Sequence, residues 1–275
     1  MSRDQQPIGF SRSTGGSSGA PATDGAQTQD PDQTTSGKIP PVDNVDGNGP
    51  YTPAIDESAG PSGGSWVFYP EELGRDGFLH PVFNWGPGAG TGPREYTDHL
   101  SRIASHGIVV ISQPSSGTGV TELAALDWIL DQNDQPDSIF YQKLDPSKVG
   151  AGGHSKGSFT TYAMGDDPRL VTTIQVCGGR SGAGANLRAP VLILGASGDM
   201  ATPGFTGDYQ AINAPVVFLT FQGSDHIMCA RDNLVPWVSW LRWHLGGEEF
   251  RRDEFVETAT SPYCKPPWEC QVKNW

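Results

Sequence analysis

The sequence predicts a single α/β domain built around a mostly parallel β-sheet. After about residue 60, short apolar segments alternate with segments whose apolar residues recur every three or four positions, which is the pattern of βαβ units. Residues 108–112 and 191–195 are apolar at nearly every position, as expected for strands that are buried on both faces. Roughly 225 residues take part, which is ample for one well-packed domain.

The pattern defines the expected elements in order along the chain. The expected strands are residues 65–69, 81–85, 108–112, 148–151, 171–177, 191–195 and 216–221. The expected helices are residues 94–105, 121–131, 158–164 and 233–245. The first of these helices, for example, places Tyr96, Leu100 and Ile103 on one face, and the last carries a stripe of tryptophans that favours a place in the core.

The first 48 residues differ in composition from the rest. They are rich in Gly, Ser, Thr, Pro, Asp and Gln, and they contain too few apolar residues to offset the entropy of ordering. We therefore expect a disordered Gly/Ser/Pro-rich linker over residues 1–48 and a folded domain over residues 49–275. Such a linker is either a solvated spacer, which is the simpler interpretation, or a tether to another molecule.

Charge and hydropathy exclude several classes of partner. The net charge is −13 and no basic cluster is present in the sequence, which argues against nucleic acid and anionic membrane surfaces. No apolar run reaches the length of a membrane span. Residues 1–10 lack the apolar core of a signal peptide, but a Gly/Ser/Pro/Asp-rich start is common just after a removed export signal. We expect an exported protein.

The sequence contains four cysteines, which support an oxidising compartment. Cys264 and Cys270 enclose a short segment near the C-terminus, where a bridge would hold the end of the chain. Cys177 ends an expected strand and Cys229 follows His226 by three residues, so a second bridge between them is possible. Four cysteines allow three pairings, and four free thiols in a cytosolic enzyme are the alternative. No spacing suggests a zinc site, and we expect neither a metal nor an organic cofactor.

Residues 148–158 carry the clearest chemical signal. They predict a strand, a tight turn of sequence Gly153-His154-Ser155-Lys156-Gly157, and a helix. In this arrangement the turn exposes a serine hydroxyl, and the flanking glycines leave room for the neighbouring strand and helix. Ser155 is therefore the candidate nucleophile, and the N–H of Lys156 at the start of the helix is a candidate donor to an oxyanion. The alternative is an ordinary glycine-rich turn.

A serine nucleophile needs a base, and the base needs an orienting carboxylate. The expected strand 191–195 leads to Asp199 and the next strand leads to His226, so both lie at the sheet edge that carries the serine turn. The order serine, acid, histidine along the chain is the order of α/β-hydrolases. Asp199 is favoured because Asp208 lies further from the strand end and Asp225 adjoins the histidine. The other histidines precede a strand, belong to helices or adjoin Ser155: His80, His99, His106, His154 and His244.

The second oxyanion donor is expected in the glycine-rich loop of residues 86–92, which follows the strand 81–85. Its glycines let backbone amides approach a ligand closely, and it lacks the ending of a phosphate-binding loop. We choose the amide of Ala89. The residues expected to bind substrate are Gly88, Gly90, His154, Gly178 and Ile227.

Taken together, these residues resemble the cutinase-like polyesterase and dienelactone-hydrolase branch of the α/β-hydrolases, which includes bacterial PET hydrolases. The matching segments are residues 66–70, 102–110, 153–157, 195–203 and 223–226, the helix with Trp237 and Trp240, and the C-terminal cysteine pair. The resemblance implies an α/β-hydrolase catalytic domain over residues 49–275. It further implies a secreted serine esterase that cleaves esters or polyesters through Ser155, His226 and Asp199.

The sequence departs from that group in several respects, one of which is an N-terminal strand pair that looks shortened. Ala89 stands where an aromatic residue is usual, Gly178-Gly179 stand where a tryptophan is usual, and Lys156 replaces a methionine. Because those aromatic residues grip the acyl group, we expect a wider and less aromatic cleft.

The expected partner is a small-molecule or polymeric ester, without nucleic acid or a membrane span, and the protein is expected to be a monomer. Two alternatives stay open. One is a lipase-like or amide-cleaving hydrolase with the same triad, and the other is a non-catalytic hydrolase fold used for binding.

Overall fold

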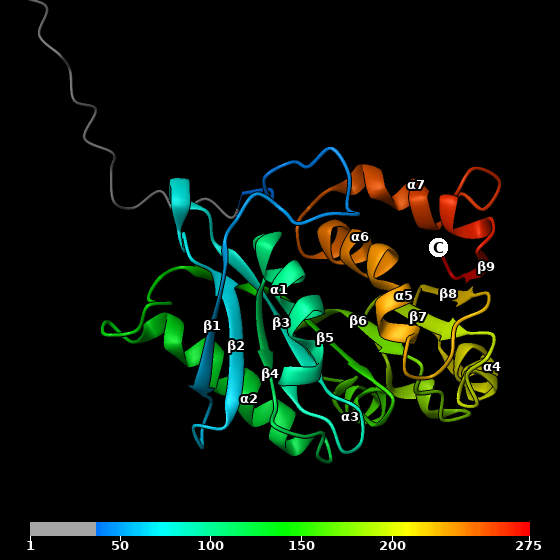
Figure 1. Cartoon of the computed structure of the whole chain (residues 1–275), viewed down its shortest axis with the longest axis horizontal. Helices are drawn as coiled ribbons and strands as arrows, with labels where there is room; N and C mark the ends of the chain where they lie inside the picture. The colour runs from blue at the N-terminus through cyan, green and yellow to red at the C-terminus, as the bar shows by residue number, and fades with distance from the viewer. Residues whose placement is uncertain (1–36) are drawn as a thin grey trace, which may run out of the picture. The chain divides into compact units, whose positions relative to one another are not determined.

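The computed structural model describes residues 37–275, and its centre is one β-sheet with the order β1-β2-β4-β3-β5-β6-β7-β8-β9 (Figure 1). The six central strands, from β4 to β8 in this order, are parallel to one another. Strands β1, β2 and β9 join the sheet at its two edges by antiparallel pairing. The predicted α/β fold with a mostly parallel sheet is therefore confirmed. The strands are β1 (Pro53–Ala59), β2 (Ser65–Pro70), β3 (His80–Gly86), β4 (Val109–Ser112), β5 (Leu144–His154), β6 (Leu170–Val176), β7 (Val191–Ala196), β8 (Val216–Phe221) and β9 (Trp268–Lys273).

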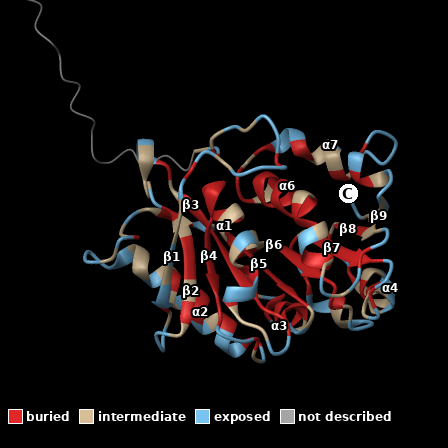
Figure 2. Cartoon of the chain, viewed as in Figure 1, coloured by how far each residue is buried: buried red, intermediate tan, exposed pale blue. Residues whose placement is uncertain are grey.

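Helices cover both faces of the sheet. They are α1 (Thr97–Ser105), α2 (Val120–Asp131), α3 (Lys156–Met164), α4 (Thr202–Ala211), α5 (Cys229–Asp232), α6 (Leu234–His244) and α7 (Arg252–Phe255). On one face, Leu100 of α1 and Trp237 of α6 share a core cluster with Phe83 of β3. On the other face, Leu126 of α2 packs with Val82 of the same strand. Alternate residues of β3 thus face opposite helix layers. Strands β3, β4 and β7 are buried along their whole length, and the other central strands are mostly buried (Figure 2).

The structure contains every strand that the sequence pattern predicted, and it adds elements that the pattern did not reveal. The additions are the edge strands β1 and β9 and the helices α4, α5 and α7. The helix expected to start at Arg94 begins with a 3-10 turn, Pro93–Tyr96, before α1. Within residues 37–275, none of the helices has both the length and the apolar character needed to cross a bilayer.

The packed domain begins before residue 49. Ile39 is 2% exposed and Val45 is 6% exposed, and both belong to the core cluster on the α1 and α6 face. The N–H of Ile39 donates to the carbonyl of Gly246 at 3.0 Å, and the guanidinium of Arg102 donates to the carbonyl of Val45. The boundary expected at residue 48 therefore lies too late, because residues 37–48 pack against the domain. The rest of the predicted linker, residues 1–36, lies outside the described residues.

Two disulfides select one of the three possible pairings. Cys177, just after β6, is bonded to Cys229, the first residue of α5, and both are fully buried. Cys264 is bonded to Cys270 of β9. The first bridge connects the central sheet to the segment that carries His226, and the second connects the edge strand to the turn before it.

Four largely buried histidines predict that the domain loses stability in mild acid. Burial lowers the pKa of His80, His106 and His154 to about 4, and that of His244 to about 3. The unfolded chain has a histidine pKa of about 6.5, so between pH 6.5 and 4 it binds protons that the folded state does not. The free energy of unfolding therefore falls as the pH falls, by at most about 1.4 kcal/mol per pH unit for each histidine.

We expect thermal unfolding curves to show a lower Tm at pH 5 than at pH 7.5. His244→Phe is the matched variant, because the ring of His244 packs against Trp240 and Trp243 and its Nε2 has no hydrogen-bond partner among the described residues. The His244→Phe variant should show a weaker dependence of the unfolding free energy on pH than the wild type. A slope unchanged by this substitution would contradict the assignment of the acid effect to buried histidines.

Candidate active site

Ser155 lies in the turn between β5 and α3. Its backbone has a φ of 55° and a ψ of −115°, a conformation that residues other than glycine rarely adopt. Helix α3 can lie this close to β3 because position 157 has no side chain: a Cβ there would overlap the backbone oxygen of Gly86. The strand–turn–helix arrangement and the reason for its glycines agree with the sequence pattern, and Ser155 remains partly exposed.

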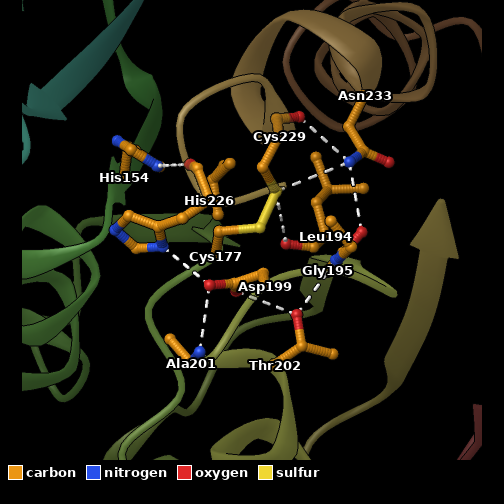
Figure 3. Close-up of a disulfide and its surroundings, with 12 residues drawn as sticks. His154, Cys177, Leu194, Gly195, Asp199, Ala201, Thr202, His226, Cys229 and Asn233 are labelled. Atoms are coloured by element: carbon orange, nitrogen blue, oxygen red, sulfur yellow. Dashed lines mark hydrogen bonds and ion pairs between the residues drawn. A yellow bond between two sulfur atoms is a disulfide. The ribbon is translucent and has the colours of Figure 1, made fainter. Parts of the chain in front are cut away.

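The side chains of Ser155, His226 and Asp199 form a continuous hydrogen-bonded chain. His226 Nε2 lies 2.9 Å from Ser155 Oγ, and His226 Nδ1 lies 2.7 Å from Asp199 Oδ1. The Asp199 side chain is fully buried, and it also accepts hydrogen bonds of 2.9 Å from the Ala201 N–H and from the Thr202 hydroxyl (Figure 3). A carboxylate held in this way accepts a hydrogen bond from the Nδ1–H of His226, which leaves Nε2 unprotonated and able to accept a hydrogen bond from the serine hydroxyl.

The two competing aspartates are engaged elsewhere. Asp208 is fully buried and accepts hydrogen bonds from the Tyr162 hydroxyl and the Arg180 N–H. Asp225 accepts from the N–H of Ile227 and closes the turn that follows it. Among residues 37–275, Asp199 is the one of the three candidates whose side chain contacts the His226 ring.

Two backbone amides, those of Lys156 and Ala89, are the predicted oxyanion donors. Lys156 is the first residue of α3, and Ala89 is the second residue of a turn closed by the Thr91 N–H and the Gly88 carbonyl at 3.2 Å. In the described part of the chain neither the Lys156 nor the Ala89 amide has a hydrogen-bond partner. Ala89 lines the cavity that contains Ser155, whereas Lys156 does not. Gly90, the third residue of the turn, has a φ of 74° that favours glycine.

A cavity of about 310 Å³ opens beside Ser155. Six predicted residues line it: Gly88, Ala89, His154, Ser155, His226 and Ile227. Five further lining residues were not predicted: Thr91, Glu95, Tyr96, His99 and Ala230. The signal that could have indicated Tyr96 and His99 is their place in the helical segment that directly follows the glycine-rich loop of residues 86–92.

Gly90 and Gly178 were expected to bind substrate, and neither lines the cavity. Gly90 serves the turn described above. A side chain at position 178 would overlap the backbone oxygen of Ser155, and one at Gly179 would overlap the backbone nitrogen of Phe205 in α4. These glycines therefore let the chain after β6 lie against the serine turn and α4. Neither glycine borders the cavity, whereas Ala89, the other position without the aromatic residue that the resemblance leads one to expect, does.

The chain matches the family model described as PET hydrolase-like over residues 34–265. No curated protein matches the chain. The matched region takes in the whole sheet up to β8, the serine turn and the loops that carry Asp199 and His226. The match covers most of the chain, and the sheet with helices on both faces agrees with it. The chain is therefore a hydrolase of the ester and polyester type, and it belongs to the PET hydrolase-like family of α/β-hydrolases.

Proposed function

We propose that the protein is a serine esterase that cleaves carboxylic esters through an acyl-enzyme formed on Ser155. The observation that carries the proposal is the hydrogen-bonded chain from Ser155 Oγ through His226 to Asp199, at the wall of a cavity. The buried carboxylate and the two amides without partners support the same reaction, because acyl transfer needs an oriented base and donors for an oxyanion.

The proposed reaction has two halves. Ser155 Oγ attacks the ester carbonyl carbon while His226 Nε2 takes the hydroxyl proton, and the amides of Ala89 and Lys156 donate to the oxyanion. The imidazolium, stabilised by Asp199, then gives its proton to the leaving alkoxide as the C–O bond breaks. Water then attacks the acyl carbon while His226 Nε2 takes a proton from it, and the imidazolium gives this proton to Ser155 Oγ as the acyl C–O bond breaks and the acid is released. Each oxyanion donor is worth about 3 kcal/mol in such a step.

The size of the cavity favours a short acyl group. A volume of about 310 Å³ is at the small end for ligand pockets, and the lining is mainly apolar. We expect turnover of p-nitrophenyl esters to be high for acetate and butyrate, to fall for octanoate and to be lowest for palmitate. Activity that rises towards palmitate would contradict the short acyl site and favour a lipase-like enzyme. Cleavage of p-nitroanilides at a comparable rate would favour an amide-cleaving hydrolase.

A binding module is the alternative from another class. It would show no turnover of any of these esters, and it would not react with a fluorophosphonate. An active wild-type enzyme would justify testing aliphatic and aromatic polyester films, with release of soluble acids as the readout.

We further propose that the protein is secreted and acts as a monomer on soluble or polymeric esters. Two disulfides, with no free cysteine in the described part of the chain, support an oxidising compartment. Size-exclusion chromatography with light scattering, on protein recovered from the culture medium, tests both statements. A dimer, or protein found only inside cells, would contradict them.

A further inference from the structure

We propose that Tyr96 and His154 form a positioning pair that couples the oxyanion loop, residues 86–92, to the backbone of His226. The inference rests on the proposed function, since it concerns the geometry in which that esterase reaction takes place. Neither residue touches the atoms that react. Their proposed role is to hold the groups that do.

Three hydrogen bonds define the pair. The Tyr96 hydroxyl lies 3.0 Å from the Gly88 N and 2.8 Å from His154 Nδ1. His154 Nε2 lies 2.9 Å from the carbonyl oxygen of His226 (Figure 3). The contacts join three segments that are distant in sequence: the loop after β3, the serine turn after β5 and the loop after β8.

The donors and acceptors admit one arrangement of protons. A carbonyl oxygen only accepts, so His154 Nε2 carries its proton and donates to His226. In a neutral imidazole Nδ1 is then an acceptor, so the Tyr96 hydroxyl donates to it. The tyrosine oxygen keeps its lone pairs for the Gly88 N–H. The Gly88 N–H therefore donates to the Tyr96 hydroxyl, the Tyr96 hydroxyl donates to His154 Nδ1, and His154 Nε2–H donates to the His226 carbonyl.

Burial keeps this arrangement neutral over the pH range in which an esterase works. Tyr96 and His154 are each 5% exposed. Burial is the main cause that lowers the pKa of His154 to about 4, and burial also raises the pKa of Tyr96. Within this range neither the phenol nor the imidazole changes its charge, so the hydrogen bonds keep the same direction.

The pair acts where the proposed chemistry is sensitive to position. Gly88 directly precedes Ala89, whose amide is the proposed oxyanion donor. The carbonyl of His226 belongs to the residue whose ring contacts both Ser155 and Asp199. Catalytic groups need to be held to within about 0.5 Å of their productive geometry. Loss of either contact frees the loop or the base to move, which reduces stabilisation of the transition state more than binding of the substrate.

Three variants test the pair. Tyr96→Phe removes the hydroxyl that serves both Gly88 and His154. His154→Phe removes both ring nitrogens and keeps an aromatic ring. His154→Gln is the rescue variant, because its amide oxygen can accept from Tyr96 while its amide nitrogen donates to the His226 carbonyl. Tyr162→Phe is the matched control, since it deletes another buried hydroxyl, which bonds Asp208 and does not line the cavity.

For p-nitrophenyl butyrate we expect Tyr96→Phe and His154→Phe to lower kcat roughly tenfold, the equivalent of about one lost hydrogen bond. For Tyr96→Phe, KM should change less than about twofold. The inhibition constant of butylboronic acid should rise by the same factor by which kcat/KM falls, because the tetrahedral adduct of the boronic acid is stabilised by the same groups as the transition state. His154→Gln should recover most of kcat, and Tyr162→Phe should keep kcat while it lowers Tm.

The inference is overturned if Tyr96→Phe retains the wild-type kcat, or if His154→Gln is as slow as His154→Phe. In the second case the loss would come from packing and not from hydrogen bonding. A wild-type protein that hydrolyses no ester would instead contradict the proposed function, so the two failures are distinguishable.

Discussion

Ser155→Ala is expected to lower the rate of p-nitrophenyl butyrate hydrolysis by at least about a thousandfold. The substitution removes the proposed nucleophile, whose Oγ lies 2.9 Å from His226 Nε2. The same change should shift Tm by less than about 3 °C, because the side chain is small and partly exposed. Steady-state kinetics and calorimetry on the same preparation give both values. Turnover near the wild-type level would remove Ser155 from the mechanism.

Ser158→Ala is the matched control for this prediction, since it changes another serine three residues further along the chain, in helix α3. Ser158 Oγ donates to the Gly153 carbonyl at 2.7 Å and accepts from the Val176 N–H at 3.1 Å, and its side chain is fully buried. Loss of the Ser158 hydroxyl should lower the free energy of unfolding by about 1–3 kcal/mol, because the buried Gly153 carbonyl and Val176 N–H lose a hydrogen-bond partner. Its kcat should stay within a few fold of wild type. The comparison of the two variants thus distinguishes an effect on catalysis from an effect on stability.

Replacement of both Cys177 and Cys229 by alanine is expected to have the largest effect on stability. The bridge joins residues 52 apart in sequence, and the loop-entropy estimate for that length is about 4 kcal/mol of unfolding free energy. Cys229 also follows His226 by three residues, so the bridge fixes the segment that carries the proposed base (Figure 3). We therefore expect kcat to fall together with Tm.

The second disulfide provides the comparison. Cys264 and Cys270 are only 6 residues apart, so replacing both by alanine should cost about 2 kcal/mol and leave kcat unchanged. Their bridge is attached to β9, which is separated from β5 and its serine turn by β6, β7 and β8. If the two double variants lost activity equally at a temperature where both are folded, the first bridge would have no special role in positioning His226.

Much of the fold could be predicted from local sequence, because the central strands are continuous apolar runs. The edge strands were not predicted because they have no continuous apolar run. Pro53–Ala59 and Trp268–Lys273 are half exposed and carry Asp, Glu, Gln and Lys, so they lack that signal. The helix Thr202–Ala211 contains two glycines and a proline, which are poor helix formers in isolation. Ile39 and Val45 are isolated apolar residues in a polar segment, and only tertiary packing reveals their burial.

The chemical groups of the candidate site were easier to predict than its lining. The serine turn and the loops after β7 and β8 each follow a strand end, and parallel strands bring such ends to one edge. The lining depends on how helix α1 sits over that edge. The sequence shows that Tyr96 lies on the apolar face of a helix, but not that this face borders the site. Gly178 follows a strand end as well, yet close packing removes it from the cavity.

The most direct test of the proposed mechanism is labelling with a fluorophosphonate. Mass spectrometry gives the number of adducts per chain and the labelled residue, and ester turnover is measured on the same samples. A phosphonyl group transfers to the hydroxyl of an activated serine, which requires the base and the oxyanion donors to act together. We predict one adduct per chain, located at Ser155, with esterase activity lost in proportion to labelling. An adduct on another residue, or full esterase activity in the labelled protein, would contradict the assignment of Ser155, His226 and Asp199 as the catalytic groups.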